Sequence, residues 1–303
     1  MKRFLSAILL LPLVSFAQRQ VAITLDDAPI MALPGYYTAA QRKATNEKLL
    51  QQITLLRTPV SIFINGAHCI IPDNQQLLKK WADNQMITLG SHTLNHPNCA
   101  DLPIDSFKME VTINDYIIKA VAKDKPVPYF RFPYNAMGKD SVAQAVRIGY
   151  LKEKGYTAVP FTVESSDYMF EQTYQEALKK KDNTKAKAIG EAYIRYTLFS
   201  FDYFEKLARE VFGRDIPQVY LCHVNQLNAD YYTTLVKALQ QRGYQCVSLQ
   251  QAMQDKAYDT PLYDHRQYGF SWLFRWIPDA AIRKSHLRNS PEPDKELAVF
   301  KSL

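Results

Sequence analysis

Strand-length apolar segments alternate with segments of helical periodicity along most of this chain, and this alternation constrains its fold more than any other feature. The first strand begins at Val21 and runs into Asp26 and Asp27. We predict further strands at 58–66, 86–92, 127–132, 156–163, 218–224 and 244–249, and helices at 40–57, 74–84, 103–123, 139–154, 170–213 and 229–242. A helix between successive strands implies parallel pairing through right-handed crossovers. We therefore predict an α/β fold, a distorted (β/α)7-8 barrel that is closed or nearly closed.

Two adjacent carboxylates end the first strand, in the stretch Val21-Ala-Ile-Thr-Leu-Asp26-Asp27-Ala-Pro29. Ionised carboxylates need partners when they are desolvated, so a buried strand gains nothing from such a pair. Neighbouring strand residues point in opposite directions, and one carboxylate could therefore bind a cation while the other handles a proton. Alone, the pair is more typical of a loop start or a helix cap. The evidence for a site has to come from the other strand ends.

A targeting segment precedes the first strand. Lys2 and Arg3 are followed by an apolar run over 4–14 and by the small residues Ser15 and Ala17, the layout of a secretory signal peptide. The run is too short to span a membrane as a helix, and we prefer cleavage after residue 17 to a retained anchor. We predict an exported mature chain, periplasmic or secreted, that begins near Gln18 and has no stable membrane insertion.

Charge and cysteine content narrow the class of protein. The formal charge of +7 falls to +5 once Lys2 and Arg3 are removed, and the basic residues are spread along the chain rather than clustered as in nucleic-acid binders. Export permits disulfides, and a bridge between Cys69 and Cys99, which both follow predicted strands, is plausible. The other two cysteines, Cys222 and Cys246, lie within predicted strands and are expected as buried free thiols.

Histidines follow the third strand. His92 and His96 are four residues apart and converge if the segment turns helically, and neutral imidazole is the commonest metal ligand in proteins. With one carboxylate from the first strand they would supply two nitrogens and an oxygen, leaving coordination positions open for water and substrate. This pattern fits a catalytic zinc site, and it could also hold Fe(II).

Later strands also end in polar residues. Arg131 stands at the end of the fourth strand and is expected to pair with a carboxylate at the same end of the barrel. Glu164 and Asp167 follow the fifth strand, and His223 ends the sixth. In a parallel barrel the active site lies where strands end and loops begin, so these side chains should meet.

Together these strand ends resemble the motifs of the polysaccharide deacetylase family, also called the NodB-homology or carbohydrate esterase family 4 group. The resemblance covers about residues 20–255 and rests on five motifs in the family's order. They are Thr24-Leu-Asp26-Asp27-Ala-Pro29, His92-Thr-Leu-Asn-His96, Arg131-Phe-Pro133-Tyr134, Glu164-Ser-Ser-Asp167-Tyr168 and Leu221-Cys-His223. The resemblance implies a hydrolase that acts on non-peptide carbon–nitrogen bonds and depends on a divalent metal, usually zinc.

The resemblance also implies roles for individual residues. Those that would hold the metal are Asp27, His92 and His96. Asp26 would be the general base, oriented by Arg131, and His223 would be the general acid, with Asp167 stabilising its charge. The remaining predicted site residues contact the substrate. Here the backbone N–H of Tyr134 would help to stabilise the oxyanion, Leu221 would line the slot for the acetyl methyl group, and Tyr168 would stand at the rim.

The chain departs from the family pattern at the rim. Ala28 replaces a glycine, Glu164 replaces an aspartate, and Tyr168 replaces the tryptophan that forms one wall of the family's groove. The stretch between Asp167 and His223 is longer than usual, and we favour a solvated helical hairpin over a lid that grips substrate. These departures leave the substrate range open.

We divide the chain into a signal peptide (1–17), a catalytic domain (18–256) and a C-terminal extension (257–303). In the extension, Trp272 and Trp276 are expected to pack on the barrel, and about the last ten residues to be frayed. The predicted function is metal-dependent removal of N- or O-acetyl groups from an exported carbohydrate such as peptidoglycan, a chitin-type oligosaccharide or acetylated xylan. The alternatives are a catalytically silent carbohydrate-binding module and a hydrolase of small non-sugar amides.

Overall fold

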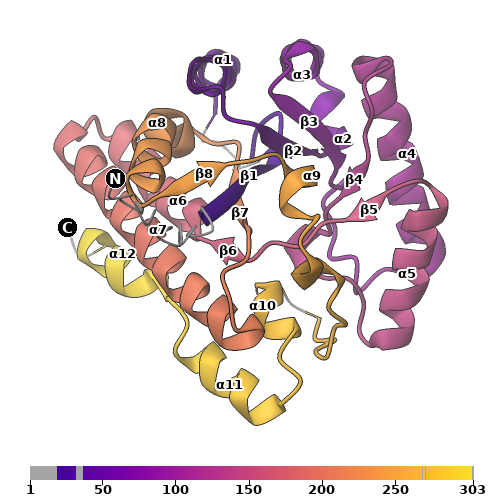
Figure 1. Cartoon of the computed structure of the whole chain (residues 1–303). Coiled ribbons are helices and arrows are strands. Elements are labelled where there is room, and N and C mark those ends of the chain that lie inside the picture. Colours follow the sequence, from indigo (N-terminus) through magenta and orange to yellow (C-terminus); the bar gives the residue numbers. More distant parts are fainter. Residues whose placement is uncertain (1–18, 32–36, 268, 270, 302–303) are drawn as a thin grey trace, which may run out of the picture.

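A curled sheet of parallel strands surrounded by helices forms the body of the molecule (Figure 1). The structure is a computed structural model that describes residues 19–31, 37–267, 269 and 271–301. The predicted signal peptide, residues 1–17, lies outside these ranges. None of the described helices is both long enough and apolar enough to cross a membrane.

The sheet has the strand order β5-β4-β3-β2-β1-β7-β6, with β8 paired to residues 19–21 of β1. Every pairing between the described strands is parallel. The strands are β1 (Arg19–Ala28), β2 (Val60–Ile64), β3 (Ile87–Ser91), β4 (Tyr129–Phe130), β5 (Thr157–Ala158), β6 (Val163–Glu164), β7 (Gln218–His223) and β8 (Tyr244–Cys246). Because β5 and β6 stand at opposite ends of this order and are joined by residues 159–162 alone, the sheet curls into a nearly closed barrel. The predicted barrel is confirmed.

The predicted strand at 156–163 is wrong in one respect, since the structure divides it into β5 and β6. Pro160 lies between them and has no backbone N–H to give to a sheet neighbour. Its carbonyl accepts a hydrogen bond from Arg131, and the carbonyl of Phe161 accepts one from the backbone N–H of Trp272. This segment therefore bonds to the site and to the C-terminal extension instead of continuing a ladder.

The helices between the strands lie close to their predicted positions. They are α1 (Ala39–Leu56), α3 (Pro72–Asp83), α4 (Ile104–Ala122), α5 (Ser141–Glu153) and α8 (Gln226–Gln241), with the short helices α2 (Gly66–Cys69) and α9 (Leu249–Ala252) in addition. In α1, Thr38 forms a capping box with Gln41, which satisfies backbone groups at the start of the helix. Apolar side chains of these helices and of the strands form one large core, in which Trp81 and Phe107 are fully buried.

The predicted helical section at 170–213 consists of two helices, α6 (Asp167–Lys179) and α7 (Asn183–Phe212). The break at 180–182 includes Lys181 with a left-handed backbone and Asp182, whose side chain caps α7. Aromatic residues join the two helices, and Phe170 and Tyr193 are fully buried between them. One face of this helical hairpin is therefore part of the core rather than solvated.

The C-terminal extension packs against the barrel and the helical hairpin through α10 (Trp272–Arg275), α11 (Ala280–Arg288) and α12 (Pro293–Lys301) (Figure 1). Both Trp272 and Trp276 are buried, as predicted. Fraying of the last ten residues is wrong for 293–301, because α12 packs on α6 and α7 and fully buries Leu297. The sequence signal for this packing is Leu297, an apolar residue on the inner face of a short helix, and our prediction missed it.

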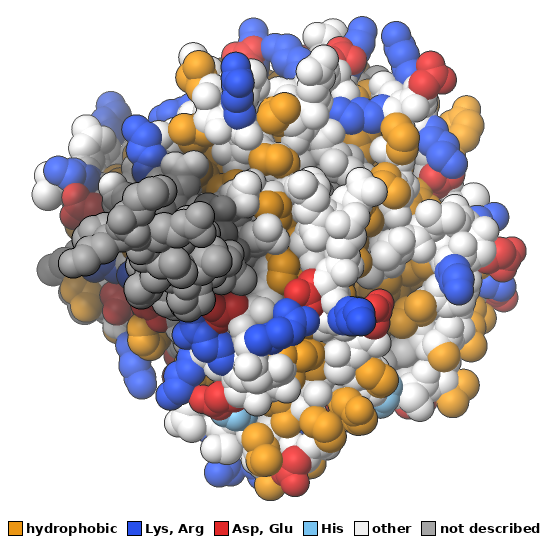
Figure 2. All heavy atoms as spheres, viewed as in Figure 1, with side chains coloured by type: hydrophobic (Ala, Val, Ile, Leu, Met, Phe, Trp, Pro, Cys, Tyr) orange, Lys and Arg blue, Asp and Glu red, His pale blue; other side chains and the backbone are white. Residues whose placement is uncertain are grey.

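The cysteines are all free thiols in the structure. The bridge considered between Cys69 and Cys99 is absent, and both side chains are buried, as is Cys222. Burial raises the pKa of the Cys69 thiol to about 12, so this group stays protonated. On the face shown in Figure 2, Lys and Arg side chains are scattered among acidic and apolar ones, in agreement with the dispersed charge of the sequence.

Candidate active site

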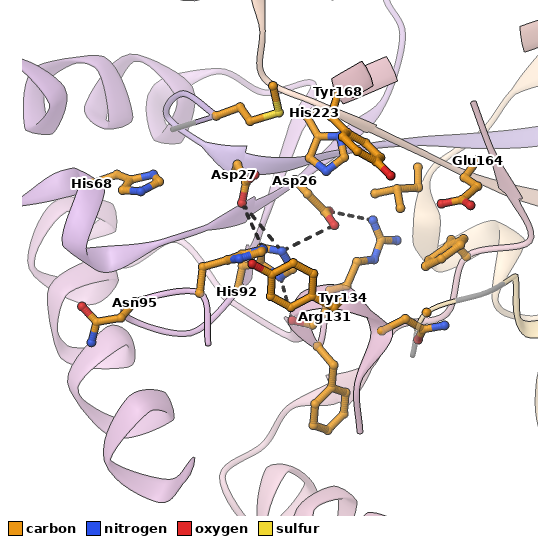
Figure 3. A pocket seen from close by; sticks show the side chains of 17 residues that line it. Asp26, Asp27, His68, His92, Asn95, Arg131, Tyr134, Glu164, Tyr168 and His223 are labelled. Carbon is orange, nitrogen blue, oxygen red and sulfur yellow. Dashed lines mark hydrogen bonds and ion pairs between the residues drawn. The ribbon is translucent and has the colours of Figure 1, made fainter. Parts of the chain in front are cut away.

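A cavity of about 630 Å³ opens at the carboxyl ends of the strands (Figure 3). Parallel strands bring their carboxyl ends to one side of the barrel, so side chains distant in sequence meet there. Nine of the ten predicted site residues line it: Asp26, Asp27, His92, His96, Arg131, Tyr134, Tyr168, Leu221 and His223. The tenth, Asp167, lies behind the wall, bonded to His223.

Three of these residues form a cluster with the composition of a metal site. One donor atom from each of Asp27, His92 and His96 lies within 4.8 Å of the others. The carboxylate oxygen Oδ1 of Asp27 is 3.8 Å from Nε2 of His92 and 3.5 Å from Nε2 of His96. Ligands around a tetrahedral ion at about 2.1 Å are separated by roughly 3.4 Å, so these separations are those of donors that share one ion.

The backbone at this cluster is locally left-handed. Asp27, Thr93 and His96 have φ values of 61°, 65° and 55°, which non-glycine residues adopt rarely. The register of β1 against β2 shifts between Leu25 and Ala28, and this irregularity turns Asp27 toward the histidines. Left-handed residues in such density are typical of functional sites, where the surrounding structure maintains the strain.

Three observations test whether this cluster suits a cation. Oδ1 of Asp27 is buried and has no hydrogen-bond partner among the residues that the structure describes. Nδ1 of His92 donates to the carbonyl of Arg131 over 2.8 Å, which leaves the lone pair of Nε2 directed at the cluster. Burial lowers the pKa of His92 well below its ordinary value, so the imidazole is neutral, as a ligand must be. The donors fit a divalent ion.

Asp26 lies beside the cluster and is held by Arg131. Its side chain is almost fully buried, and its Oδ1 accepts a hydrogen bond of 2.8 Å from Nη1 of Arg131. The guanidinium also donates to Thr24 and to the carbonyl of Pro160, and it stacks 4.2 Å from the ring centre of Phe63. Burial raises the pKa of Asp26 above its ordinary value, and Arg131 opposes this only in part. The carboxylate is thus fixed in orientation and more basic than a solvated one.

His223 faces Asp26 from the neighbouring strand. The two residues are paired across β1 and β7, and Figure 3 shows them side by side at the cavity. Nδ1 of His223 lies 2.8 Å from Oδ1 of Asp167. Burial alone would lower the pKa of His223, but the charge and hydrogen bond of Asp167 outweigh it and raise the pKa to about 10. The imidazole is therefore protonated at neutral pH.

Asp167 is positioned from several directions. Its Oδ2 accepts hydrogen bonds from the backbone N–H of His223 and from the side chains of Asn225 and Asn228. Burial would raise the pKa of Asp167, but the charge of His223 and these hydrogen bonds lower it. The ion pair thus joins the first residue of α6, Asp167, to the last residue of β7, His223.

The rim of the cavity, where Tyr134 and Tyr168 lie, is more exposed than its floor, which Asp26, His92 and Arg131 form. Tyr134 and Tyr168 are 57% and 48% exposed, and their rings lie against those of His96 and His223 respectively. Leu221 is an apolar residue of the wall. Glu164 also lines the cavity, and burial raises its pKa to about 7.

Sequence reasoning missed several residues of the cavity wall: Met31, His68, Asn95, Asn135, Phe161 and Gly269. His68 follows the end of β2 and could have been found by its position, as the other strand-end residues were. It stays outside the three-residue cluster. Gly269 belongs to the C-terminal extension, which has no motif that could have placed it here.

Comparison with known proteins gives a family match over the first half of the barrel. Residues 14–157 match the model of the polysaccharide deacetylase family. No curated protein matches the sequence.

Solved structures share the fold. A carbohydrate esterase family 4 pseudoenzyme from Bacillus anthracis is 13% identical, with 83% of this chain and 67% of that chain covered and a TM-score of 0.55. A peptidoglycan N-acetylglucosamine deacetylase is 16% identical, with coverages of 79% and 90% and a TM-score of 0.55. The family 4 domain of a xylanase from the hindgut metagenome of Trinervitermes trinervoides is 15% identical, with coverages of 79% and 92% and a TM-score of 0.53.

Proposed function

We propose that this chain, whose residues 14–157 match the model of the polysaccharide deacetylase family, removes N- or O-acetyl groups from an exported or cell-envelope carbohydrate in a metal-dependent reaction. One observation carries the proposal. The cluster of Asp27, His92 and His96 lies in the same cavity as a buried carboxylate, Asp26, and a protonated imidazole, His223. Since a relative of this fold is a pseudoenzyme, the activity is inferred from these side chains and not from the fold.

The three clustered residues would hold one divalent ion, for which we propose zinc. Two imidazole nitrogens and a carboxylate oxygen are a ligand set that catalytic zinc sites use, with room left for water and substrate. When bound, the ion would supply Lewis-acid chemistry, lowering the pKa of a water molecule to about 7 and polarising the acetyl carbonyl.

Asp26 would take the proton from the attacking water. Its carboxylate is fixed by Arg131 and has a raised pKa, two properties that suit a general base. Its Oδ2 lies 3.6 Å from Nε2 of His92, so the base is next to the ligand cluster. Arg131 would act through Asp26, holding one oxygen and leaving the other for the proton.

His223 would donate the proton to the leaving amine or alcohol. It carries that proton at neutral pH because Asp167 stabilises the imidazolium. Burial makes Asp26 a stronger base than a solvated carboxylate, whereas the ion pair with Asp167 keeps His223 protonated, so the two side chains suit opposite proton transfers.

The substrate would be positioned by the rim. The backbone N–H of Tyr134 would donate to the developing oxyanion, since a preorganised donor stabilises charge that forms only in the transition state. Leu221 would contact the acetyl methyl group. The exposed rings of Tyr134 and Tyr168 would offer faces for a sugar ring.

Acetate release tests this proposal. Metal-loaded mature protein is incubated with chito-oligosaccharides, peptidoglycan or acetylated xylan, and we expect acetate from at least one of them. Binding to these glycans without acetate release would instead favour the silent carbohydrate-binding module. Acetate from small non-sugar amides alone would favour the amidase alternative. Export by the predicted signal peptide is part of the proposal, and the N-terminal sequence of the secreted protein checks it.

A further inference from the structure

The turn that carries Tyr134 has an unusual backbone. Tyr134 and its neighbour Asn135 have φ values of 55° and 51°, so two successive non-glycine residues are left-handed. Such a conformation persists only where contacts outside the turn maintain it. Tyr134 is more than half exposed, whereas Asn135 is buried, so the contacts that could hold the turn are those of Asn135.

The C-terminal extension supplies these contacts. Nε1 of Trp272 donates a hydrogen bond of 2.6 Å to Oδ1 of Asn135. Nη2 of Arg275 donates one of 3.1 Å to the Asn135 carbonyl, so one residue is held by both its side chain and its backbone. Gly269 lies directly against the turn, since a Cβ added there would come 2.2 Å from the carbonyl oxygen of Tyr134.

Helix α10 is itself fixed to the barrel, so these contacts have a rigid base. The hydroxyl of Ser271 donates to the carbonyl of Thr162 over 2.6 Å, and the backbone N–H of Trp272 donates to the carbonyl of Phe161 over 3.0 Å. Trp272 is buried and packs edge-on against Trp276. The turn is thereby connected to the segment between β5 and β6.

We propose that Trp272 is a positioning residue for deacetylation, which holds the Tyr134–Asn135 turn so that the Tyr134 N–H meets the oxyanion. This inference rests on the proposed function. It assigns to the C-terminal extension a part in the reaction, although none of its side chains needs to touch the substrate. If the Tyr134 N–H is displaced, the transition state is stabilised less, whereas the binding of the substrate in the ground state changes little.

The chain offers a matched control for Trp272. The indole N–H of Trp276 has no hydrogen-bond partner within the described part of the chain, and this ring is also buried, directly after α10. Trp272→Phe and Trp276→Phe thus remove the same atoms from neighbouring rings, but only the first removes a contact to Asn135. We expect Trp272→Phe to lower kcat for acetate release about tenfold with KM within about twofold, and Trp276→Phe to leave kcat within about twofold.

A second substitution separates positioning from a general loss of structure. Glycine adopts the left-handed conformation without strain, so in Asn135→Gly the turn depends less on Trp272. We expect the kcat loss caused by Trp272→Phe to shrink to about twofold in the Asn135→Gly background. Equal losses in both backgrounds, or equal losses from the two Trp→Phe variants, would overturn the proposal.

Amide hydrogen exchange tests the contact without any substrate. Exchange in the peptide that spans Tyr134 and Asn135 should become at least tenfold faster in Trp272→Phe and stay unchanged in Trp276→Phe. Unchanged exchange in both variants would contradict the positioning role even if the wild-type protein releases acetate. The wild-type protein could also release no acetate while exchange is faster in Trp272→Phe and unchanged in Trp276→Phe. That result would support the contact, although the proposed function fails.

Discussion

Replacing Asp26 with asparagine should lower kcat for acetate release by about 10³-fold, in the range that general acid–base catalysis contributes. The amide has nearly the shape of the carboxylate, and its oxygen can still accept the hydrogen bond from Arg131. It cannot take a proton from water, so the base is removed while the geometry stays. Kinetics of acetate release, with metal content measured in the same preparation, check this prediction.

The neighbouring aspartate is the control. Asp27→Asn changes the same functional group one residue away, at the position whose buried oxygen faces His92 and His96. It should lose activity together with bound metal, whereas Asp26→Asn should lose activity and keep the metal. An Asp26→Asn protein that is fully active would exclude Asp26 as the base.

Replacing Asp167 with asparagine should move the alkaline limit of activity to lower pH. The pKa of His223 is about 10 because Asp167 outweighs the effect of burial, and the acid form therefore persists up to that pH. Without the carboxylate, burial lowers the pKa from about 10, and only the smaller effects of Asp27 and Asp26 oppose it. At the ordinary pKa of about 6.5, about one imidazole in thirty is protonated at pH 8. Since the general acid must be protonated, kcat at pH 8 should fall about thirtyfold. A pH profile of kcat between pH 5 and 10 measures this.

Another buried carboxyl on the same helix serves as the control. Glu171 lies one turn after Asp167 in α6, and it accepts hydrogen bonds from Tyr37, Gln175 and the backbone of Leu227 instead of from His223. Glu171→Gln should leave the alkaline limit where it is in the wild type. An unchanged limit in Asp167→Asn would show that His223 does not depend on Asp167 for its proton.

The barrel and the meeting of polar side chains in its cavity could be predicted from the sequence because both depend on short local patterns. A strand is recognised from a few apolar residues, and parallel strands bring their carboxyl ends to one side of the barrel. Asp26, His92 and His223 each stand at such an end, so their meeting follows from strand positions alone. The same reasoning found Arg131 and its carboxylate partner, since a buried guanidinium needs one.

The remaining features depend on contacts between segments that are distant in sequence. The separation of β5 from β6 follows from Pro160 and from bonds to Arg131 and to Trp272, and apolar periodicity carries no information on such bonds. The approach of Gly269 to Tyr134 likewise joins two segments that are more than a hundred residues apart in the sequence. The cysteine pairing was uncertain for the same reason, because two strand-end loops can lie near each other without bringing their thiols together.

We propose that Asp27, His92 and His96 hold one metal ion on which deacetylation depends, and a metal titration of the stripped protein tests this most directly. Metal-free protein is titrated with zinc while acetate release from a reactive glycan is followed. We predict that the rate rises linearly and stops rising at one equivalent per chain.

Two histidine variants serve as a matched pair in this titration. In a His96→Ala protein the rise should need at least about a hundredfold more zinc. His68→Ala changes a histidine of the same cavity that lies outside the cluster, and it should keep the break at one equivalent. Acetate release at full rate by the metal-free protein would contradict the account.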